Sequence, residues 1–137
     1  ENANPTLNKL ACKKTPYGDK PAFSISINHK KTFTVITDND RARTIKEFAG
    51  IVERGCSKKD FTDNFYSPGH VHLLISRGLG KRRGHTELAI ELMKKAHLPP
   101  AVVLCELLGN GTALSRESAK KFAVKNGFEF LEGDEIC

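Results

Sequence analysis

The sequence lacks the features that mark several large classes of protein. It has no tryptophan and no Cys-x-x-Cys pair, since its cysteines stand alone at positions 12, 56, 105 and 137; zinc ribbons and thioredoxin-type motifs are therefore excluded. The longest strictly apolar run, Ala101 to Cys105, is far too short to span a bilayer. No basic segment followed by an apolar stretch stands at the start, so we expect no signal peptide. Together with the uneven cysteine spacing, these absences predict a soluble, cytoplasmic protein with reduced thiols.

The composition is that of one globular domain with a basic surface. The chain has 137 residues, of which 39% are hydrophobic, and its 22 basic and 16 acidic residues give a net charge of +6. This balance favours an anionic partner, which could be a nucleic acid, a membrane surface or a phosphorylated metabolite. Most lysines form scattered doublets typical of a solvated surface. Aromatic residues are not interleaved with the basic ones, which argues against a nucleic-acid-binding module.

Hydrophobic periodicity and turn residues predict an alternation of strands and helices. A period of two predicts the first strand, and helical spacing after the cap candidates at 37–40 predicts the first long helix. Strands are expected at 22–29, 32–36, 70–76, 101–106 and 128–131, and helices at 41–54, 86–97 and 115–126. Residues 57–67 are expected to be irregular. The predicted fold class is α/β, or α+β: one domain over 22–137 with a mixed β-sheet and helices packed on its faces, after an irregular lead-in over 1–21.

Three segments place polar groups beside the ends of these elements. Lys81 to Glu87 is a basic loop that enters a helix N-terminus, where a phosphate could bind, although it could also be a solvated loop. Pro68 to His72 contains two histidines at i and i+2, which could form a metal pair but more often have no such role. Glu106 ends an apolar run and is either a helix-capping partner or a general acid/base.

Taken in order, four motifs resemble those of the 3,4-dihydroxy-2-butanone 4-phosphate synthase family. The similarity extends from about Ala22 to the C-terminus, and the stretch 24–32 is most similar to the archaeal branch. The motifs are Phe33-Thr34 with Thr37-Asp38-Asn39-Asp40-Arg41-Ala42, Pro68-Gly69-His70-Val71, Arg82-Arg83-Gly84-His85-Thr86-Glu87, and Leu104-Cys105-Glu106-Leu107. The resemblance implies a lyase of riboflavin biosynthesis that converts D-ribulose 5-phosphate to 3,4-dihydroxy-2-butanone 4-phosphate and formate.

The resemblance also implies roles for individual residues. Arg82 and Thr86 would hold the substrate phosphate, helped by backbone N–H groups around Arg83 and Gly84. His70 and Glu106 would be the essential acid/base groups. His85 would be a ligand of Mg²⁺ or Mn²⁺. The substrate-binding set implied is Arg82, Arg83, Gly84, His85, Thr86 and Glu106. Family members are homodimers with active sites at the subunit interface, and we expect the same here, with neither a nucleic acid nor a membrane as partner.

One departure from the family pattern concerns the metal site. The family carries an N-terminal strand and an acidic loop of the form Arg-Glu-Asn-Glu-Gly-Asp, which supplies the other metal ligand, and no such segment is present. We therefore expect the chain to be an incomplete version of its domain. The alternative is a catalytically inactive homologue that serves as a phosphate-binding or interaction domain. His72 has no counterpart role in the family.

Overall fold

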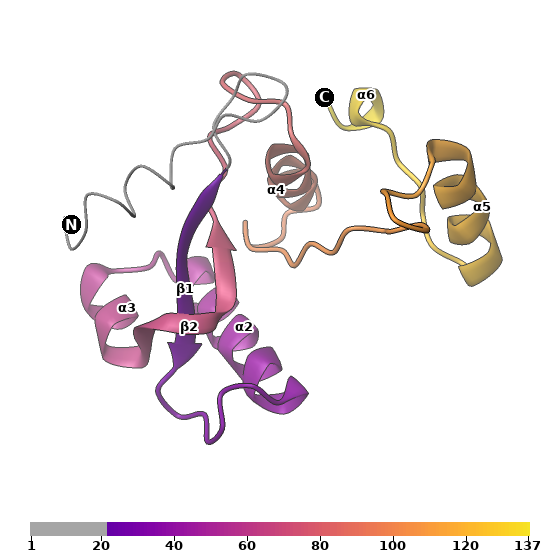
Figure 1. Ribbon diagram of the computed structural model, residues 1–137. Coiled ribbons are helices and arrows are strands. Elements are labelled where there is room, and N and C mark those ends of the chain that lie inside the picture. The colour runs from indigo at the N-terminus through magenta and orange to yellow at the C-terminus, as the bar shows by residue number, and fades with distance from the viewer. Residues whose placement is uncertain (1–21) are drawn as a thin grey trace, which may run out of the picture.

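The computed structural model describes residues 22–137, so the lead-in expected over 1–21 lies outside the described residues. Helices accompany a small antiparallel sheet (Figure 1), which confirms the α+β class. The elements, in chain order, are β1 (Phe23–His29), α2 (Asp38–Glu53), α3 (Lys58–Asn64), β2 (Phe65–Leu74), α4 (His85–Lys95), α5 (Arg116–Asn126) and α6 (Gly133–Ile136). None of the helices within 22–137 is long and apolar enough to cross a membrane.

The sheet consists of β1 and β2, which run antiparallel, with Phe23 opposite Leu74 and His29 opposite Phe65. It is not the mixed sheet that the sequence predicts, because the other predicted strands do not form in the described residues. Those segments are 32–36, 101–106 and 128–131, all of which are irregular. Only Ile27 of the alternating apolar residues in β1 is fully buried, whereas Phe23 is 72% exposed.

Helix α2 packs on one face of this sheet and confirms the first predicted helix. It begins three residues earlier than expected because Thr37 caps it, its hydroxyl accepting a hydrogen bond from the Asp40 N–H at 3.3 Å. After the helix, Gly55 adopts φ of +79°, a left-handed conformation that glycine enters without the steric cost of a Cβ atom. Ile51 turns into the core with 3% exposure.

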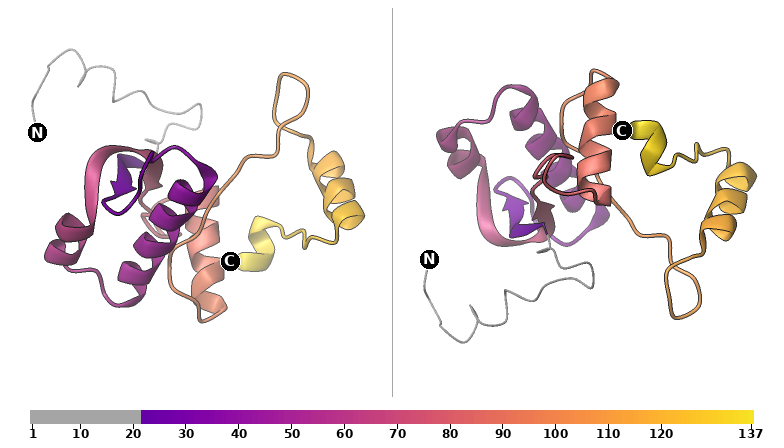
Figure 2. Two further views of the ribbon diagram at one scale, coloured as in Figure 1. Left: turned by 90° about the horizontal axis from the view of Figure 1, so that it is seen from below. Right: turned by 90° about the horizontal axis from the view of Figure 1, so that it is seen from above.

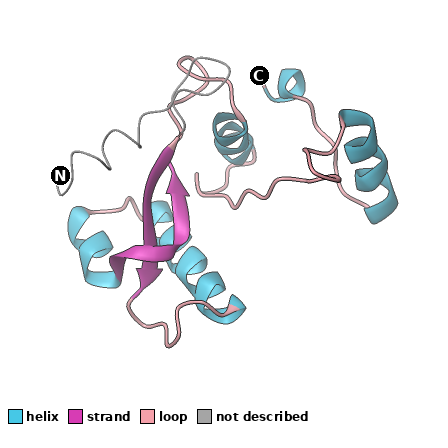
Figure 3. Cartoon of the chain, viewed as in Figure 1, coloured by secondary structure: helices cyan, strands magenta, loops and turns pink. Residues whose placement is uncertain are grey.

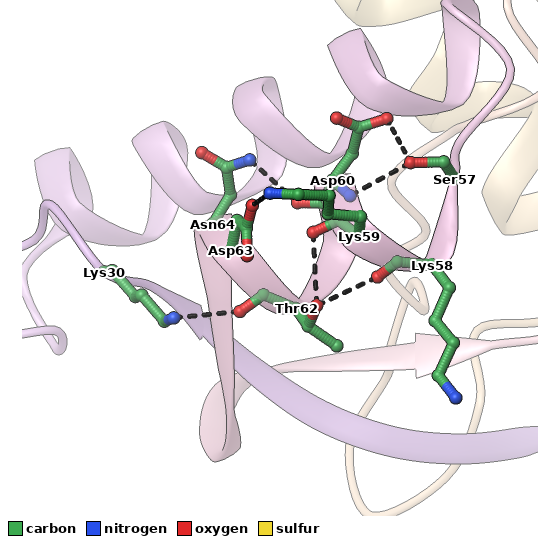
Figure 4. A network of polar contacts seen from close by, with 8 residues as sticks. All are labelled: Lys30, Ser57, Lys58, Lys59, Asp60, Thr62, Asp63 and Asn64. Carbon is green, nitrogen blue, oxygen red and sulfur yellow. Dashed lines mark hydrogen bonds and ion pairs between the residues drawn. The ribbon is translucent and has the colours of Figure 1, made fainter.

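Helix α3 occupies most of a segment that the sequence predicts to be irregular. Ser57 caps it by accepting from the Asp60 N–H at 3.0 Å, and its own hydroxyl donates to the Asp60 carboxylate (Figure 4). Lys30, just beyond β1, donates through Nζ to the carbonyl oxygen of Thr62 at 2.8 Å. The helix is therefore held by its cap and by a direct link to the end of β1.

The core lies between the sheet and helices α2 and α3. Ile27, Ile51 and Phe65 are its buried centre, and Phe48 and Phe61 pack against them. The Phe61 and Phe65 rings stack with centroids 5.4 Å apart, and this contact holds α3 and the start of β2 to the core. Burial of each such side chain contributes roughly 1.5–3 kcal/mol.

The segment between β1 and α2 forms a loop around Asp40 instead of a strand. The Asp40 carboxylate accepts hydrogen bonds from three successive backbone N–H groups, those of Phe33, Thr34 and Val35. Val35 has φ of +62°, which is unusual for a β-branched residue. In a strand, these N–H groups would bond to a neighbouring strand. Here the Asp40 side chain accepts all three hydrogen bonds.

Residues 101–104, beyond α4, still lie beside β2, but the chain then leaves the sheet, and α5 stands apart from it in every view (Figures 1 and 2). Helix α5 confirms the last predicted helix: Ser115 caps its start, and Gly127 ends it with φ of +68°. The residues that follow are loop (Figure 3), and α6, which the sequence analysis did not predict, packs near α4.

Candidate active site

A cavity of about 540 Å³ lies between the N-terminus of α4 and the segment around residue 106. It unites four of the residues singled out from the sequence, although they come from segments twenty residues apart. The lining residues are Leu74, Arg82, His85, Thr86, Leu104, Cys105, Glu106, Leu107, Ala113 and Leu114. The lining therefore includes an arginine, a histidine, a threonine and a glutamate.

The polar end of this cavity is built on the first turn of α4. Gly84 occupies the N-cap position, and its backbone N–H donates to the Glu87 carboxylate at 3.2 Å, which is the reciprocal half of a capping box. Thr86 is 8% exposed. Unpaired N–H groups and the positive end of the helix dipole make such a turn suited to an anion.

Glu87 organises the loop that precedes the helix. Its side chain is fully buried and accepts from the Arg82 guanidinium at 2.7 Å and from the Arg77 backbone N–H at 3.1 Å. A Cβ atom on Gly84 would lie 2.4 Å from Nη1 of Arg82, so the absence of a side chain at Gly84 lets the guanidinium pack against the backbone. Because of these contacts, Arg82 reaches the cavity wall in a fixed position.

The same contacts set the ionisation of Glu87. Burial raises the pKa of its carboxyl, but the hydrogen bonds from the Arg77 N–H and the Arg82 guanidinium lower it by more, so the pKa lies below its usual 4.5. Glu87 is therefore an anion at neutral pH, and its charge is matched by Arg82.

Other predicted site residues lie outside this cavity. Arg83 is exposed in the turn before α4, and neither it nor Gly84 belongs to the lining. His70 lies on the same face of β2 as Leu74, which does line the cavity, but four residues away, or about 13 Å along a strand. The structure brings Arg82, Thr86 and Glu106 together and leaves His70 in the middle of β2, outside the lining of the cavity.

The donor set does not complete a site for a hard divalent cation. Such ions prefer several oxygen ligands. Within residues 22–137 no three His, Cys, Asp or Glu side chains are grouped so that they could hold a metal ion. His85 and Glu106 are the imidazole and the carboxylate that the cavity offers.

Two residues that the sequence analysis did not assign have organising roles. Glu87 belongs to one of the four motifs, but the only feature of the sequence that indicates its contacts is its position three residues after Gly84, the N-cap residue of α4. Asn28 is 2% exposed and contacts His70 through both polar atoms of its side chain, Oδ1 and Nδ2. No local signal in the sequence identifies Asn28, because its partner lies 42 residues away.

Comparison with known proteins identifies the family of this chain. The family model described as 3,4-dihydroxy-2-butanone 4-phosphate synthase matches residues 6–137. The chain belongs to this family. The match begins earlier than the resemblance at about Ala22 that the motifs indicate, and it includes part of the predicted lead-in.

Three relatives show how the similarity is distributed. The 3,4-dihydroxy-2-butanone 4-phosphate synthase of Methanothermobacter thermautotrophicus is 47% identical over 136 residues, 96% of this chain and 59% of the relative. That of Archaeoglobus fulgidus is 40% identical over 126 residues, 88% of this chain and 53% of the relative. The riboflavin biosynthesis protein RibBA of Bacillus mycoides is 36% identical over 111 residues, 76% of this chain and 26% of the relative. The chain spans somewhat more than half the length of the archaeal relatives.

Proposed function

We propose that the chain supplies the phosphate-binding and proton-transfer part of a 3,4-dihydroxy-2-butanone 4-phosphate synthase. This lyase of riboflavin biosynthesis would convert D-ribulose 5-phosphate to 3,4-dihydroxy-2-butanone 4-phosphate and formate. Family membership and the names of the relatives support the proposal. The observation that carries it is the shared cavity of Arg82, His85, Thr86 and Glu106.

The phosphate would bind at the first turn of α4. Arg82 and the Thr86 hydroxyl line the cavity beside the helix N-terminus, and together they provide a cationic fork, a hydroxyl donor and backbone N–H groups. Backbone N–H groups around Arg83 and Gly84 would also contribute, apart from that of Gly84 itself, which donates to the Glu87 carboxylate. Such a set matches the charge and the acceptor oxygens of a phosphate monoester.

Proton transfer would fall to Glu106 and His70. Enolisation of a ketose phosphate removes a proton bonded to carbon, and a carboxylate facing the bound sugar is suited to accept it. Glu106 faces the same cavity as the phosphate-binding residues. His70, on the face of β2 that leads to Leu74, would act at the other end of the substrate.

A divalent cation, Mg²⁺ or Mn²⁺, is also part of the proposal, with His85 as one ligand. When bound, it would supply Lewis-acid stabilisation of an enediolate. Because the described residues do not provide enough ligands for such an ion, no step of the mechanism above depends on it.

We further propose that the chain acts as a homodimer in the cytoplasm. The support for association is the exposure of apolar side chains along one segment, where Val103 is 64% and Leu108 69% exposed. Analytical ultracentrifugation tests this, and we expect a dimer that Leu108→Glu weakens. A chain that is monomeric at all concentrations would contradict it.

The activity is tested by incubating the full chain with D-ribulose 5-phosphate and Mg²⁺ or Mn²⁺ and measuring formate. We expect formate release that falls by about 100-fold in Glu106→Gln, which keeps the shape of the side chain but cannot accept the proton. Glu129→Gln, an exposed glutamate beyond the cavity, is the matched control and should leave the rate unchanged. Binding of the substrate without any formate would favour the inactive homologue.

A further inference from the structure

The two strands of the sheet do not pair evenly where His70 lies. Ile27 is opposite Val71, whereas the next residue of β1, Asn28, is opposite Tyr66. Residues 67–70 therefore form a bulge in β2. Bulges of this kind redirect side chains and are common beside functional sites. The bulge lies close against β1, because a Cβ atom on Gly69 would be 2.0 Å from the carbonyl carbon of Ile27.

Side chains of β1 replace the missing backbone pairing of this bulge. The Gly69 N–H donates to the Ser26 hydroxyl at 3.1 Å, and the His70 N–H donates to Oδ1 of Asn28 at 2.9 Å. A backbone N–H can only donate, so Asn28 must present its oxygen to His70. This contact fixes which way the amide of Asn28 is oriented.

The orientation of the amide in turn decides the state of the His70 ring. With Oδ1 on the His70 backbone, Nδ2 of Asn28 lies 3.3 Å from Nδ1 of His70 and 3.5 Å from the Tyr66 hydroxyl. An amide nitrogen donates and does not accept, so Nδ1 of His70 must accept. In a neutral imidazole whose Nδ1 accepts, the proton is on Nε2.

We propose that Asn28 is a positioning residue that holds His70 in the Nε2–H tautomer, so that within the proposed acid/base pair His70 acts as the hydrogen-bond donor and Glu106 as the base. The inference deepens the proposed function and rests on it for the role of His70. A neutral imidazole donating from Nε2 can stabilise negative charge that develops on a substrate oxygen. Removal of a carbon-bound proton is then left to Glu106.

The tautomer of the His70 ring in this chain is measured directly by long-range ¹H–¹⁵N correlation spectra of the histidine rings at alkaline pH, with His70 assigned through His70→Asn. We expect a protonated Nε2 and an unprotonated Nδ1 in the unsubstituted protein. A proton on Nδ1 would overturn the inference, and this result does not depend on any variant folding correctly.

Asn28→Asp is the sharpest perturbation, because it keeps an oxygen for the His70 N–H and replaces the Nδ2 donor by an acceptor. We expect the neutral ring to move to the Nδ1–H tautomer and formate release to fall about 100-fold, with the KM for D-ribulose 5-phosphate unchanged. Ser26→Ala, which removes the other side-chain acceptor of the bulge, is the matched control and should leave the tautomer as it is.

The two proposals fail in different ways. If the tautomer is Nε2–H and moves in Asn28→Asp, but neither protein releases formate, the positioning contact stands and the proposed function fails. If formate release is unaffected by Asn28→Asp although the tautomer moves, or if the tautomer does not move, the inference about His70 is wrong while the synthase activity is untouched.

Discussion

Removal of the Glu87 charge tests how the loop before α4 is held. Glu87→Gln keeps the volume of a side chain that is fully buried and bonded to Arg82, Arg77 and Gly84. An amide offers only one acceptor oxygen. If that oxygen keeps the hydrogen bonds from Arg82 and Gly84, the new NH₂ group lies opposite the Arg77 N–H. Both of these groups are donors, so neither finds an acceptor there.

The size of the effect follows from these contacts. A hydrogen bond to a charged group contributes about 1.5–3 kcal/mol, and breaking a buried ion pair from one side costs about 3–5 kcal/mol. Because Gln retains one acceptor, we expect Glu87→Gln to lower the free energy of unfolding by about 3 kcal/mol. A chain of this size has a total stability of only about 5–15 kcal/mol, so the loss is large.

Urea unfolding at pH 7 measures this loss, with Glu91→Gln as the control. Glu91 lies one turn further along α4 and pairs only loosely with the exposed Lys94, 3.7 Å away, so its substitution should cost less than about 0.5 kcal/mol. The loss of stability caused by Glu87→Gln should shrink as the pH falls below about 4.5, because the carboxyl of the unfolded chain then binds a proton more readily than the native one, whose pKa is lower. Equal stabilities of the Glu87→Gln protein and the unsubstituted protein at pH 7 would refute the network.

Three further outcomes are expected. Arg82→Lys should weaken ribulose 5-phosphate binding by about 10-fold to 100-fold in calorimetry, since an ammonium cannot reproduce a bidentate fork; an unchanged affinity would remove Arg82 from the site. The pKa of His29 is lowered by its burial, so the unfolded chain binds this proton more readily and the free energy of unfolding should fall as the pH drops below about 6.5; His29→Gln should abolish this slope between pH 7.5 and 5.5. Val35→Gly should raise the thermal midpoint or leave it unchanged, because relief of the positive φ offsets the added chain entropy; a lower midpoint would show that φ at Val35 is not strained.

The helices that the sequence predicts correctly are those with strong local signals. Thr37 and Ser115 cap α2 and α5, and Gly127 ends α5 in a left-handed conformation, so each boundary depends on residues within one turn. Helix α3 was missed because its seven residues contain one apolar side chain, Phe61, and so no hydrophobic periodicity. Its Ser57 cap was the one available signal.

The residues of the candidate site also differ in whether a local signal in the sequence identifies them. The segment that carries Arg82 and Thr86 could be predicted, because a basic loop that enters a helix can be recognised from a few consecutive residues. The geometry of His70 could not be predicted, because it depends on a contact with Asn28 in another strand. It also depends on a shift in the register of β1 and β2, which the hydrophobic periodicity of the sequence does not reveal. Long-range side-chain contacts of this kind require the fold itself.

The segment 101–106 shows what an apolar pattern does and does not determine. Its composition predicts a strand covered on both faces, and residues 101–104 do lie beside β2 and α2, where they enclose a cavity of about 190 Å³. Yet they form no backbone ladder with β2, and Val103 remains largely exposed. Burial requires only that apolar atoms approach other apolar atoms, whereas a strand requires its N–H and C=O groups to come within about 3 Å of matching groups on a neighbour. The strand predicted for this segment is therefore wrong, and it is the position of the segment beside β2 that brings Glu106 to the cavity of Arg82 and Thr86.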